Sequence, residues 1–232
     1  MAFASFLVLL LIDRDQAVLE RTATAETERL VLDDGSIVWL TRGSRLKYQR
    51  KSDTEIRHAE LEGEGFFEVA KDPDRPFMVA CGSMTVKVVG TSFNLKTGSE
   101  HIELEVLTGR VNLSSPADKT GVDVSPREKV IYSKDGIVEK LTLKESEIQT
   151  IIESTDYDMR FANTTMDKVF TKIEKKFDVK VVVENTTVNK CRMTADFTDQ
   201  SLEKTMSMIA DLLDIEYRIV KNEVTVSGKG CD

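Results

Sequence analysis

Hydrophobic and polar residues alternate with a period close to two from about Glu28 to Lys140. Turn residues interrupt this pattern at roughly the 8–12 residue spacing that is typical of an all-β unit. This many short strands in one flat sheet would leave exposed edges. The sheet must therefore fold over on itself. The pattern predicts an all-β domain over residues 26–140, built as an elongated sandwich or a twisted, solenoid-like coil of strands.

The clearest hairpin in this region is the segment RLVLDDGSIVWL. Asp34 and Gly35 separate two alternating runs, and glycine supplies the positive φ that a tight turn needs. The turn lies between Leu30 and Leu32 on one side and Val38 and Leu40 on the other.

The pattern changes to a helical period in the last third of the chain. After a short predicted linker helix over residues 141–156, the segment 157–228 reads strand, helix, strand, and then repeats this order thirty-six positions later. The paired positions include Phe161 with Phe197, Met166 with Leu202, Phe170 with Met206, Ile173 with Ile209, Phe177 with Leu213 and Asp178 with Asp214. We therefore predict a small α/β domain of duplicated βαβ units, with both helices on one face of a single small sheet.

The first twelve residues, MAFASFLVLLLI, carry no charge. At about 1.5 Å per residue a helix of this length reaches about 18 Å, short of the roughly 30 Å hydrocarbon core of a bilayer. Two interpretations remain open: a buried helix of the fold, or the C-terminal part of a transmembrane helix that begins upstream. Because no polar face is visible, we favour the second and assign residues 1–15 to a truncated transmembrane helix.

Composition narrows the partners and the chemistry. The chain of 232 residues is 41% hydrophobic and 31% charged, with a net charge of −8, which argues against a nucleic-acid partner. Its three cysteines, Cys81, Cys191 and Cys231, and its two histidines have no zinc-binding spacing. Whether two of the cysteines pair stays open, since sequence separation does not give the distance between side chains.

The segment from Arg57 to Val79 contains closely spaced glutamates that could suggest a carboxylate-based active site. Strand alternation places Glu60, Glu64 and Glu68 on faces opposite the apolar side chains, so we expect them to be solvated. A glycosidase would need one acid in a hydrophobic pocket and a second at a defined separation, and local spacing indicates neither. We assign no catalytic residue.

Other fragments of known motifs also lack their context. Ser201 to Lys204 fits S-x-x-K, but the K-T-G triplets at 96–98 and 119–121 precede it and no S-D-N lies between, so a helix start explains the serine better. The segment GEGFFE lacks the third glycine and the helix of a dinucleotide fingerprint. No pattern indicates a cofactor or a metal site.

Six blocks of the β half resemble the FecR family in order and spacing. The blocks are Leu32-x-Asp34-Gly35-Ser36-x-Val38-x-Leu40, Ser44-x-Leu46-x-Tyr48, Arg57-x-x-x-Leu61-x-Gly63-Glu64-Gly65-Phe66-Phe67-Glu68-Val69, Arg75-Pro76-Phe77-x-Val79, Val89-Gly90-Thr91-x-Phe93-Asn94 and Leu107-x-Gly109-x-Val111. The duplicated tail, Tyr157 to Ser227, resembles the small C-terminal domain of many FecR-like proteins, which is similar to the secretin and TonB short N-terminal fold.

This resemblance implies a non-enzymatic, single-pass sensor of the inner membrane, with most of this chain in the periplasm. Its partners would be the signalling domain of an outer-membrane TonB-dependent transducer and an extracytoplasmic-function sigma factor. The sigma factor would bind a cytoplasmic segment that this chain lacks.

Two further hypotheses follow. The last strand, EVTVS, with Val224 and Val226, could offer an exposed edge to the transducer by strand addition. The alternative function is a periplasmic carbohydrate-binding or hydrolytic β protein, with Glu60, Glu64, Glu68 and Trp39 around a sugar. A lone tryptophan more often serves packing, which makes this the second choice.

Overall fold

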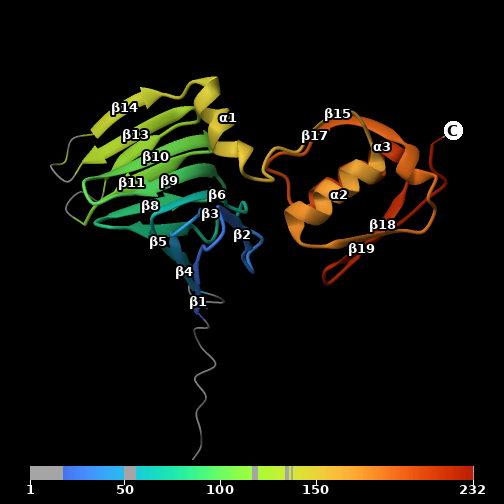
Figure 1. The fold of residues 1–232 in the computed structure, drawn as a ribbon, viewed down its shortest axis with the longest axis horizontal. Coiled ribbons are helices and arrows are strands. Elements are labelled where there is room, and N and C mark those ends of the chain that lie inside the picture. The colour runs from blue at the N-terminus through green and yellow to red at the C-terminus, as the bar shows by residue number, and fades with distance from the viewer. Residues whose placement is uncertain (1–17, 50–55, 117–119, 134–135, 137, 232) are drawn as a thin grey trace, which may run out of the picture.

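The computed structural model describes residues 18–49, 56–116, 120–133, 136 and 138–231. A β-sandwich and a smaller C-terminal unit lie side by side, and helix α1 (Glu145–Glu153) leads from one to the other (Figure 1). The predicted transmembrane segment, residues 1–15, lies outside the described residues. Within the described ranges, no helix has the length and hydropathy needed to cross a membrane.

Two seven-stranded sheets form the sandwich. The first sheet contains, in spatial order, β1 (Val18–Thr22), β4 (Arg45–Gln49), β5 (Arg57–Glu62), β7 (Phe77–Cys81), β8 (Met84–Val88), β11 (Val111–Ser114) and β12 (Val122–Val124). The second sheet contains β14 (Val138–Thr142), β13 (Glu128–Ser133), β10 (His101–Thr108), β9 (Ser92–Thr97), β6 (Glu64–Glu68), β3 (Ile37–Thr41) and β2 (Thr27–Val31).

The predicted hairpin is confirmed as β2 and β3, which pair antiparallel in a register that sets Leu30 opposite Val38. Its turn uses Gly35 at φ 83°, and the Asp34 carboxylate accepts hydrogen bonds from the backbone N–H and the hydroxyl of Ser36. Short-range chemistry therefore fixes this turn, as the sequence indicates.

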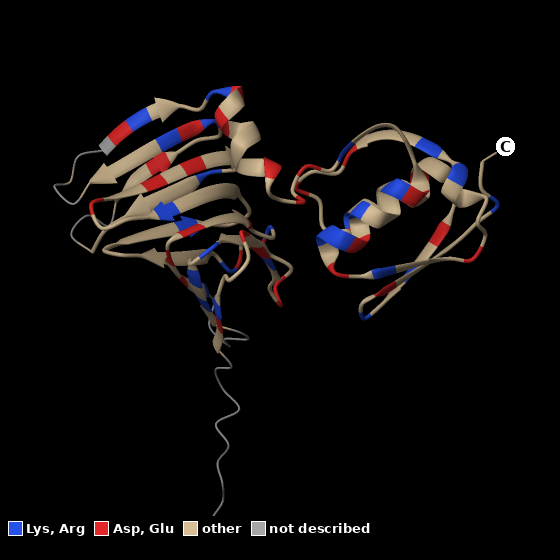
Figure 2. Cartoon of the chain, viewed as in Figure 1, with Lys and Arg blue, Asp and Glu red and all other residues tan. Residues whose placement is uncertain are grey.

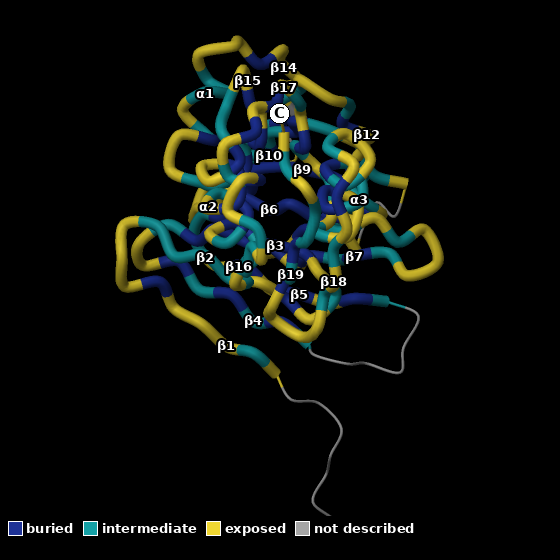
Figure 3. The backbone as a smooth tube through the Cα atoms, turned by 90° about the vertical axis from the view of Figure 1, so that its right-hand side faces the viewer, coloured by how far each residue is buried: buried dark blue, intermediate teal, exposed yellow. Residues whose placement is uncertain are grey.

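The core of the sandwich lies between the sheets and is built from the apolar side of each strand. Phe67 of the second sheet stacks on Phe93 with ring centroids 5.0 Å apart and meets Phe77 of the first sheet edge-on. The prediction of a β-rich fold is confirmed, and of the two forms considered the structure is the sandwich. Figure 3 shows buried strands surrounded by exposed loops, and Figure 2 shows both signs of charge interspersed over both units.

The C-terminal unit has the predicted repeated order of elements. It contains β15 (Arg160–Thr165), α2 (Met166–Phe177), β16 (Lys180–Val183), a 3₁₀ turn (Val188–Lys190), β17 (Arg192–Asp196), α3 (Leu202–Leu213), β18 (Glu216–Val220) and β19 (Glu223–Ser227). Both helices end in a left-handed residue at equivalent positions, Asp178 and Asp214. The duplication thus extends to the way each helix stops.

The strands of this unit do not form the single sheet that the sequence predicts. β15 and β17 pair as one two-stranded sheet, while β16, β19 and β18 form a separate three-stranded sheet. Side chains from both sheets and both helices share one core, which includes Phe161 and Val224. The helices therefore need not lie on one face of a common sheet, because two small sheets bury their apolar sides around them.

A disulfide joins Cys191, which precedes β17, to Cys231 near the end of the chain. The third cysteine, Cys81, is free and buried in the sandwich core. The sequence left open whether two of the cysteines pair. The fold brings Cys191 and Cys231, which are 40 positions apart in the sequence, to a Cα–Cα distance of 5.3 Å, and they are bonded.

Candidate functional site

The outer face of the second sheet carries aromatic side chains that water barely reaches. Trp39 and Phe66 are register partners on β3 and β6, and each is 3% exposed. Ile152 of α1 and Tyr157 of the connector (residues 154–159) cover them, and the Tyr157 ring meets Phe66 edge-on with centroids 4.9 Å apart. We call this contact region, together with the end of α2, the junction, because it joins the sandwich to the C-terminal unit.

A charged pair is buried in the junction. Glu68 at the end of β6 is 9% exposed and Lys176 in the last turn of α2 is 0% exposed, with 2.8 Å between Lys176 Nζ and Glu68 Oε1. The ammonium also donates to the Tyr157 carbonyl oxygen at 3.4 Å and lies over the rings of Tyr157 and Phe177. The expectation that Glu68 is solvated is therefore wrong. Alternation placed it correctly on the outer face, but a helix 108 positions later covers that face.

Burial raises the pKa of Glu68 to about 7, even though Lys176 favours the charged carboxylate. Asp199 adds a smaller repulsion in the same direction as burial. The second carboxylate oxygen, Oε2, is buried and makes no hydrogen bond. Removing a carboxylate from water costs free energy that one ammonium only partly offsets.

Asp199, in the loop before α3, connects the C-terminal unit to the connector and to the sandwich. Its Oδ2 accepts a hydrogen bond from the Tyr157 hydroxyl at 3.0 Å, and its Oδ1 accepts one from the Ser92 hydroxyl on β9. Burial and the nearby Asp199 carboxylate raise the pKa of Tyr157. The hydroxyl therefore stays protonated and acts as a donor.

The backbone at the end of α2 is also attached to the sandwich. Arg29 of β2 donates to the carbonyl oxygen of Lys176 and lies 3.6 Å from the carboxylate of Asp178. A cation beside the carbonyl end of a helix is favourable because those carbonyls lack intrahelical partners. Side chain and backbone of the same helical turn thus both contact the sandwich.

The four residues of the carbohydrate alternative do not converge on one site. Glu64 and Trp39 line a cavity of about 370 Å³ beneath α1, Glu68 lines another of about 640 Å³ between the two units, and Glu60 lines a third of about 360 Å³ on the first sheet. Trp39 is packed rather than presented to a ligand. Glu60, Glu64 and Glu68 therefore do not form the carboxylate pair that this alternative requires.

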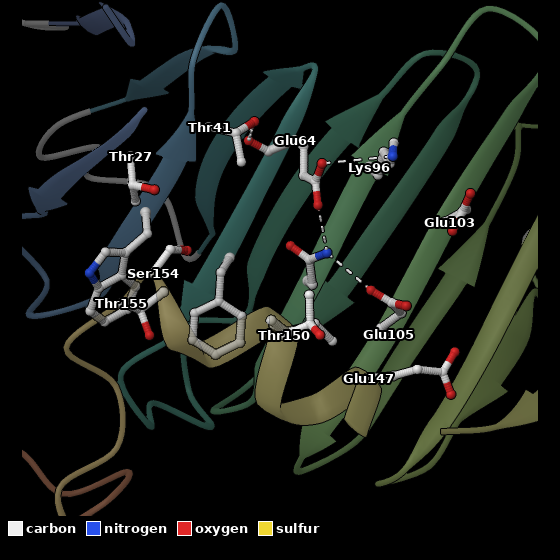
Figure 4. Close-up of a pocket in the computed structure, with 14 residues that line it drawn as sticks. Thr27, Thr41, Glu64, Lys96, Glu103, Glu105, Glu147, Thr150, Ser154 and Thr155 are labelled. Carbon is white, nitrogen blue, oxygen red and sulfur yellow. Dashed lines mark hydrogen bonds and ion pairs between the residues drawn. The ribbon is translucent and has the colours of Figure 1, made fainter. Parts of the chain in front are cut away.

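The polar groups in the cavity beneath α1 contact one another (Figure 4). The Asn94 amide donates to Glu64 at 3.1 Å and to Glu105 at 3.0 Å, and Lys96 lies 3.9 Å from Glu64. These are cross-strand pairs on a sheet surface, which stabilise strand pairing. The prediction that Glu64 is solvated is met only in part, because its side chain is 33% exposed.

The proposed partner-binding edge is not an edge. β19 is the central strand of its sheet, paired in parallel with β16 and antiparallel with β18. Val224 and Val226 are both 0% exposed and belong to the core of the C-terminal unit. The prediction of an exposed edge is wrong because β16, an earlier strand of the same unit, pairs with the side of β19 that β18 leaves open.

The motif fragments take structural roles. Ser201 is the N-cap of α3, and its hydroxyl accepts a hydrogen bond from the backbone N–H of Lys204 at 3.2 Å, as expected for a helix start. Gly90 has φ 151°, and a Cβ there would lie 2.8 Å from the Lys71 backbone, so glycine permits a close approach. Among the described residues, no group of histidine, cysteine and acidic side chains is arranged to hold a metal.

Comparisons with known proteins place both units. The family model for the FecR protein matches residues 19–112, and the model for the FecR C-terminal region matches residues 158–226. Two crystal structures of a proposed anti-sigma factor from Parabacteroides distasonis ATCC 8503 share the fold, each at 24% sequence identity and a TM-score of 0.54. They cover 92% and 91% of this chain and 100% of their own. No curated protein matches the chain.

Proposed function

The chain belongs to the FecR family, and on this premise we propose that it is the sensor part of an anti-sigma factor. It receives a signal outside the cytoplasm and relays it across the inner membrane to an extracytoplasmic-function sigma factor. The observation that carries this proposal is that one family model covers most of the sandwich and the other covers the C-terminal unit. The C-terminal unit, with its duplicated strand–helix–strand order, is proposed to be related to the secretin and TonB short N-terminal fold.

The disulfide supports placement of this part in the periplasm. Disulfides persist in oxidising compartments and are rare in the cytosol, and Cys191 and Cys231 are bonded here. In this arrangement the sandwich and the C-terminal unit lie in the periplasm, and the sigma factor is bound on the cytoplasmic side of the inner membrane. Non-reducing electrophoresis of protein from the native host, with thiols blocked at lysis, tests the compartment through the state of this bond.

The periplasmic partner is proposed to be the signalling domain of a TonB-dependent outer-membrane transducer, which pairs with the edge of β18. β16 and β18 are the outer strands of the three-stranded sheet. The outward N–H of Val181 on β16 already donates to Glu174 of α2 at 2.8 Å, which leaves β18 as the better edge for strand addition. Side chains on β18, including the exposed Arg218, would then select the partner.

This function needs no bond chemistry, in keeping with a regulatory family. A ligand shifts a conformational equilibrium when it binds one arrangement more tightly than the other. Glu64 and Glu105 share the cavity beneath α1 and both accept from the Asn94 amide, whereas Glu68 lines another cavity and pairs with Lys176, which suits a scaffold.

Binding of the purified full chain to the signalling domain of the transducer encoded nearest to it tests the proposal. Calorimetry should give a saturable interaction that Arg218→Glu weakens at least tenfold. Lys180→Glu on the opposite edge strand is the matched control and should bind like the wild type. Failure of every signalling domain to bind, together with unchanged sigma-dependent transcription after deletion of the gene, would reject the sensor role.

A further inference from the structure

The two units of this chain have separate cores. The sandwich core and the core of the C-terminal unit share no residue, and Glu68 and Lys176 belong to neither. Each unit therefore retains its own apolar packing when the charged pair is removed. The pair acts on the contact between the units, and its ammonium also contacts the Tyr157 carbonyl oxygen and the rings of Tyr157 and Phe177.

We propose that Glu68 and Lys176 form a latch that holds the C-terminal unit closed on the sandwich, and that the chain exchanges between this closed arrangement and an open one. In the closed arrangement the two charges satisfy each other at 2.8 Å, away from water. In the open arrangement both are hydrated separately. The pair offsets its own desolvation cost only in part, and the apolar contact of Tyr157 with Phe66 favours closure, so the closed arrangement is favoured by a modest margin.

The space around the latch fits a contact that opens. A cavity of about 640 Å³ lies beside Glu68, between the segment after β6 and the start of α3. Glu68 Oε2 has no partner, and the nearby charged groups on the other elements are Asp199 before α3, Lys71 after β6, and Glu203 and Lys204 in α3. The closed junction is thus incompletely filled, and water can reach the pair through a small separation of the units.

The latch itself requires no partner. In the proposed function, on which this step rests, it is the contact that the signal breaks. A partner that binds the open arrangement more tightly would release the C-terminal unit from the sandwich. The experiment below uses no partner. A failure of the latch is therefore distinguishable from a failure of the sensor role.

Tyr157 reports the open arrangement. It lies in the connector, is 5% exposed, and is covered by Phe66 and by the hydrogen bond to Asp199. Separation of the units exposes it to a protease that cuts after aromatic residues. Chymotrypsin cleavage at this bond yields two fragments, residues 1–157 and 158–232, which mass spectrometry identifies.

Limited chymotrypsin digestion of the full chain tests the latch. Glu68→Ala should raise the rate of cleavage after Tyr157 at least tenfold, because it leaves the Lys176 ammonium buried without its acceptor on the sandwich. Lys176→Met should raise the rate as well, and the double variant E68M/K176M should return toward the wild-type rate, because no charge is then buried. The controls are Glu64→Ala on the same strand and Lys168→Met, an exposed position on the same helix; both should match the wild type.

Wild-type cleavage rates in both single variants, with circular dichroism unchanged, would overturn the latch. If a single variant fails to fold, the exchanged pair E68K/K176E decides. Protection of Tyr157 in the exchanged pair supports the latch, and rapid cleavage of a folded exchanged pair overturns it.

Discussion

Two cations in the described part of the chain are almost completely buried against carboxylates, and they act at different places. Arg57 is 5% exposed and pairs with Asp34 at 2.7 Å inside the sandwich, where it also donates to the carbonyl oxygens of Ala70 and Arg75. Lys176 joins one unit to the other. The first pair fixes a hairpin turn against the loops around it, and the second sets how the units meet.

The charge state of Glu68 predicts a pH dependence of stability. Its pKa is raised from 4.5 to about 7 in the folded chain, so its contribution is fully present below about pH 4.5 and is lost as the pH rises through about 7. A shift of this size corresponds to about 3 kcal/mol. The margin between the two melting temperatures, wild type minus Glu68→Gln, should therefore fall from pH 5 to pH 8, because only the wild type has an ionisable group at this position. Thermal unfolding followed by circular dichroism measures the margin, and a margin that grows with pH would contradict the assignment.

The Arg57 pair predicts a large loss of stability on truncation. Arg57→Met leaves the Asp34 carboxylate buried without its cation and should lower the free energy of unfolding by about 3–5 kcal/mol. Arg75→Met removes an exposed pair with Asp72 and should cost less than about 1 kcal/mol. Urea unfolding of the three proteins provides the comparison. Equal losses in both variants would show that burial of the Arg57 pair does not matter.

Residue patterns predicted the apolar stripe of α2 but not the buried lysine within it. Position 176 lies between Ile173 and Phe177 on the side of the helix that the stripe marks, and the duplication pairs it with Leu212, which is 59% exposed. A lysine inside an apolar stripe, opposite a leucine in the repeat, is the one available hint that α2 packs against a second surface. The sequence could not identify Glu68 as its partner, because that contact depends on how two separate units meet.

Helices, strands and turns that depend on neighbouring residues were predicted well from the sequence. The pairing of the strands in the C-terminal unit was not. The hairpin at Asp34-Gly35, the strands of the sandwich and the two repeated helices follow from turn chemistry and periodicity. The division of the C-terminal strands into two sheets and the central place of β19 depend on the parallel pairing of β16 with β19, which no local pattern encodes. The buried positions of Val224 and Val226 follow from that pairing.

The disulfide predicts an effect confined to the C-terminal unit. It closes a loop with a sequence separation of 40, and such a loop restricts the unfolded chain by about 4 kcal/mol at 25 °C. Cys231→Ser should destabilise the C-terminal unit by up to this amount and leave the sandwich unchanged. Hydrogen exchange read separately for β19 and β6 measures both units. A reducing agent should give the wild type the same exchange pattern, and equal protection of β19 in both proteins would refute the role of the bond.

As a whole, the molecule consists of two separately packed units that meet at the covered outer face of one sheet. For a member of the FecR family this geometry offers a route to the sandwich from the binding event that we propose for the C-terminal unit. The route runs through α2, whose last turn holds Lys176 against Glu68 and whose backbone contacts Arg29. Glu68 takes part in this contact, and Glu60 and Glu64 lie near lysines on neighbouring strands.

The rate of chymotrypsin cleavage after Tyr157, measured on the full chain with and without a saturating transducer signalling domain, tests most directly whether binding acts on the junction. We predict that the bound chain is cleaved several times faster, because the partner favours the open arrangement. An unchanged or slower rate, at a concentration where calorimetry shows full binding, would contradict a signal that passes through this junction.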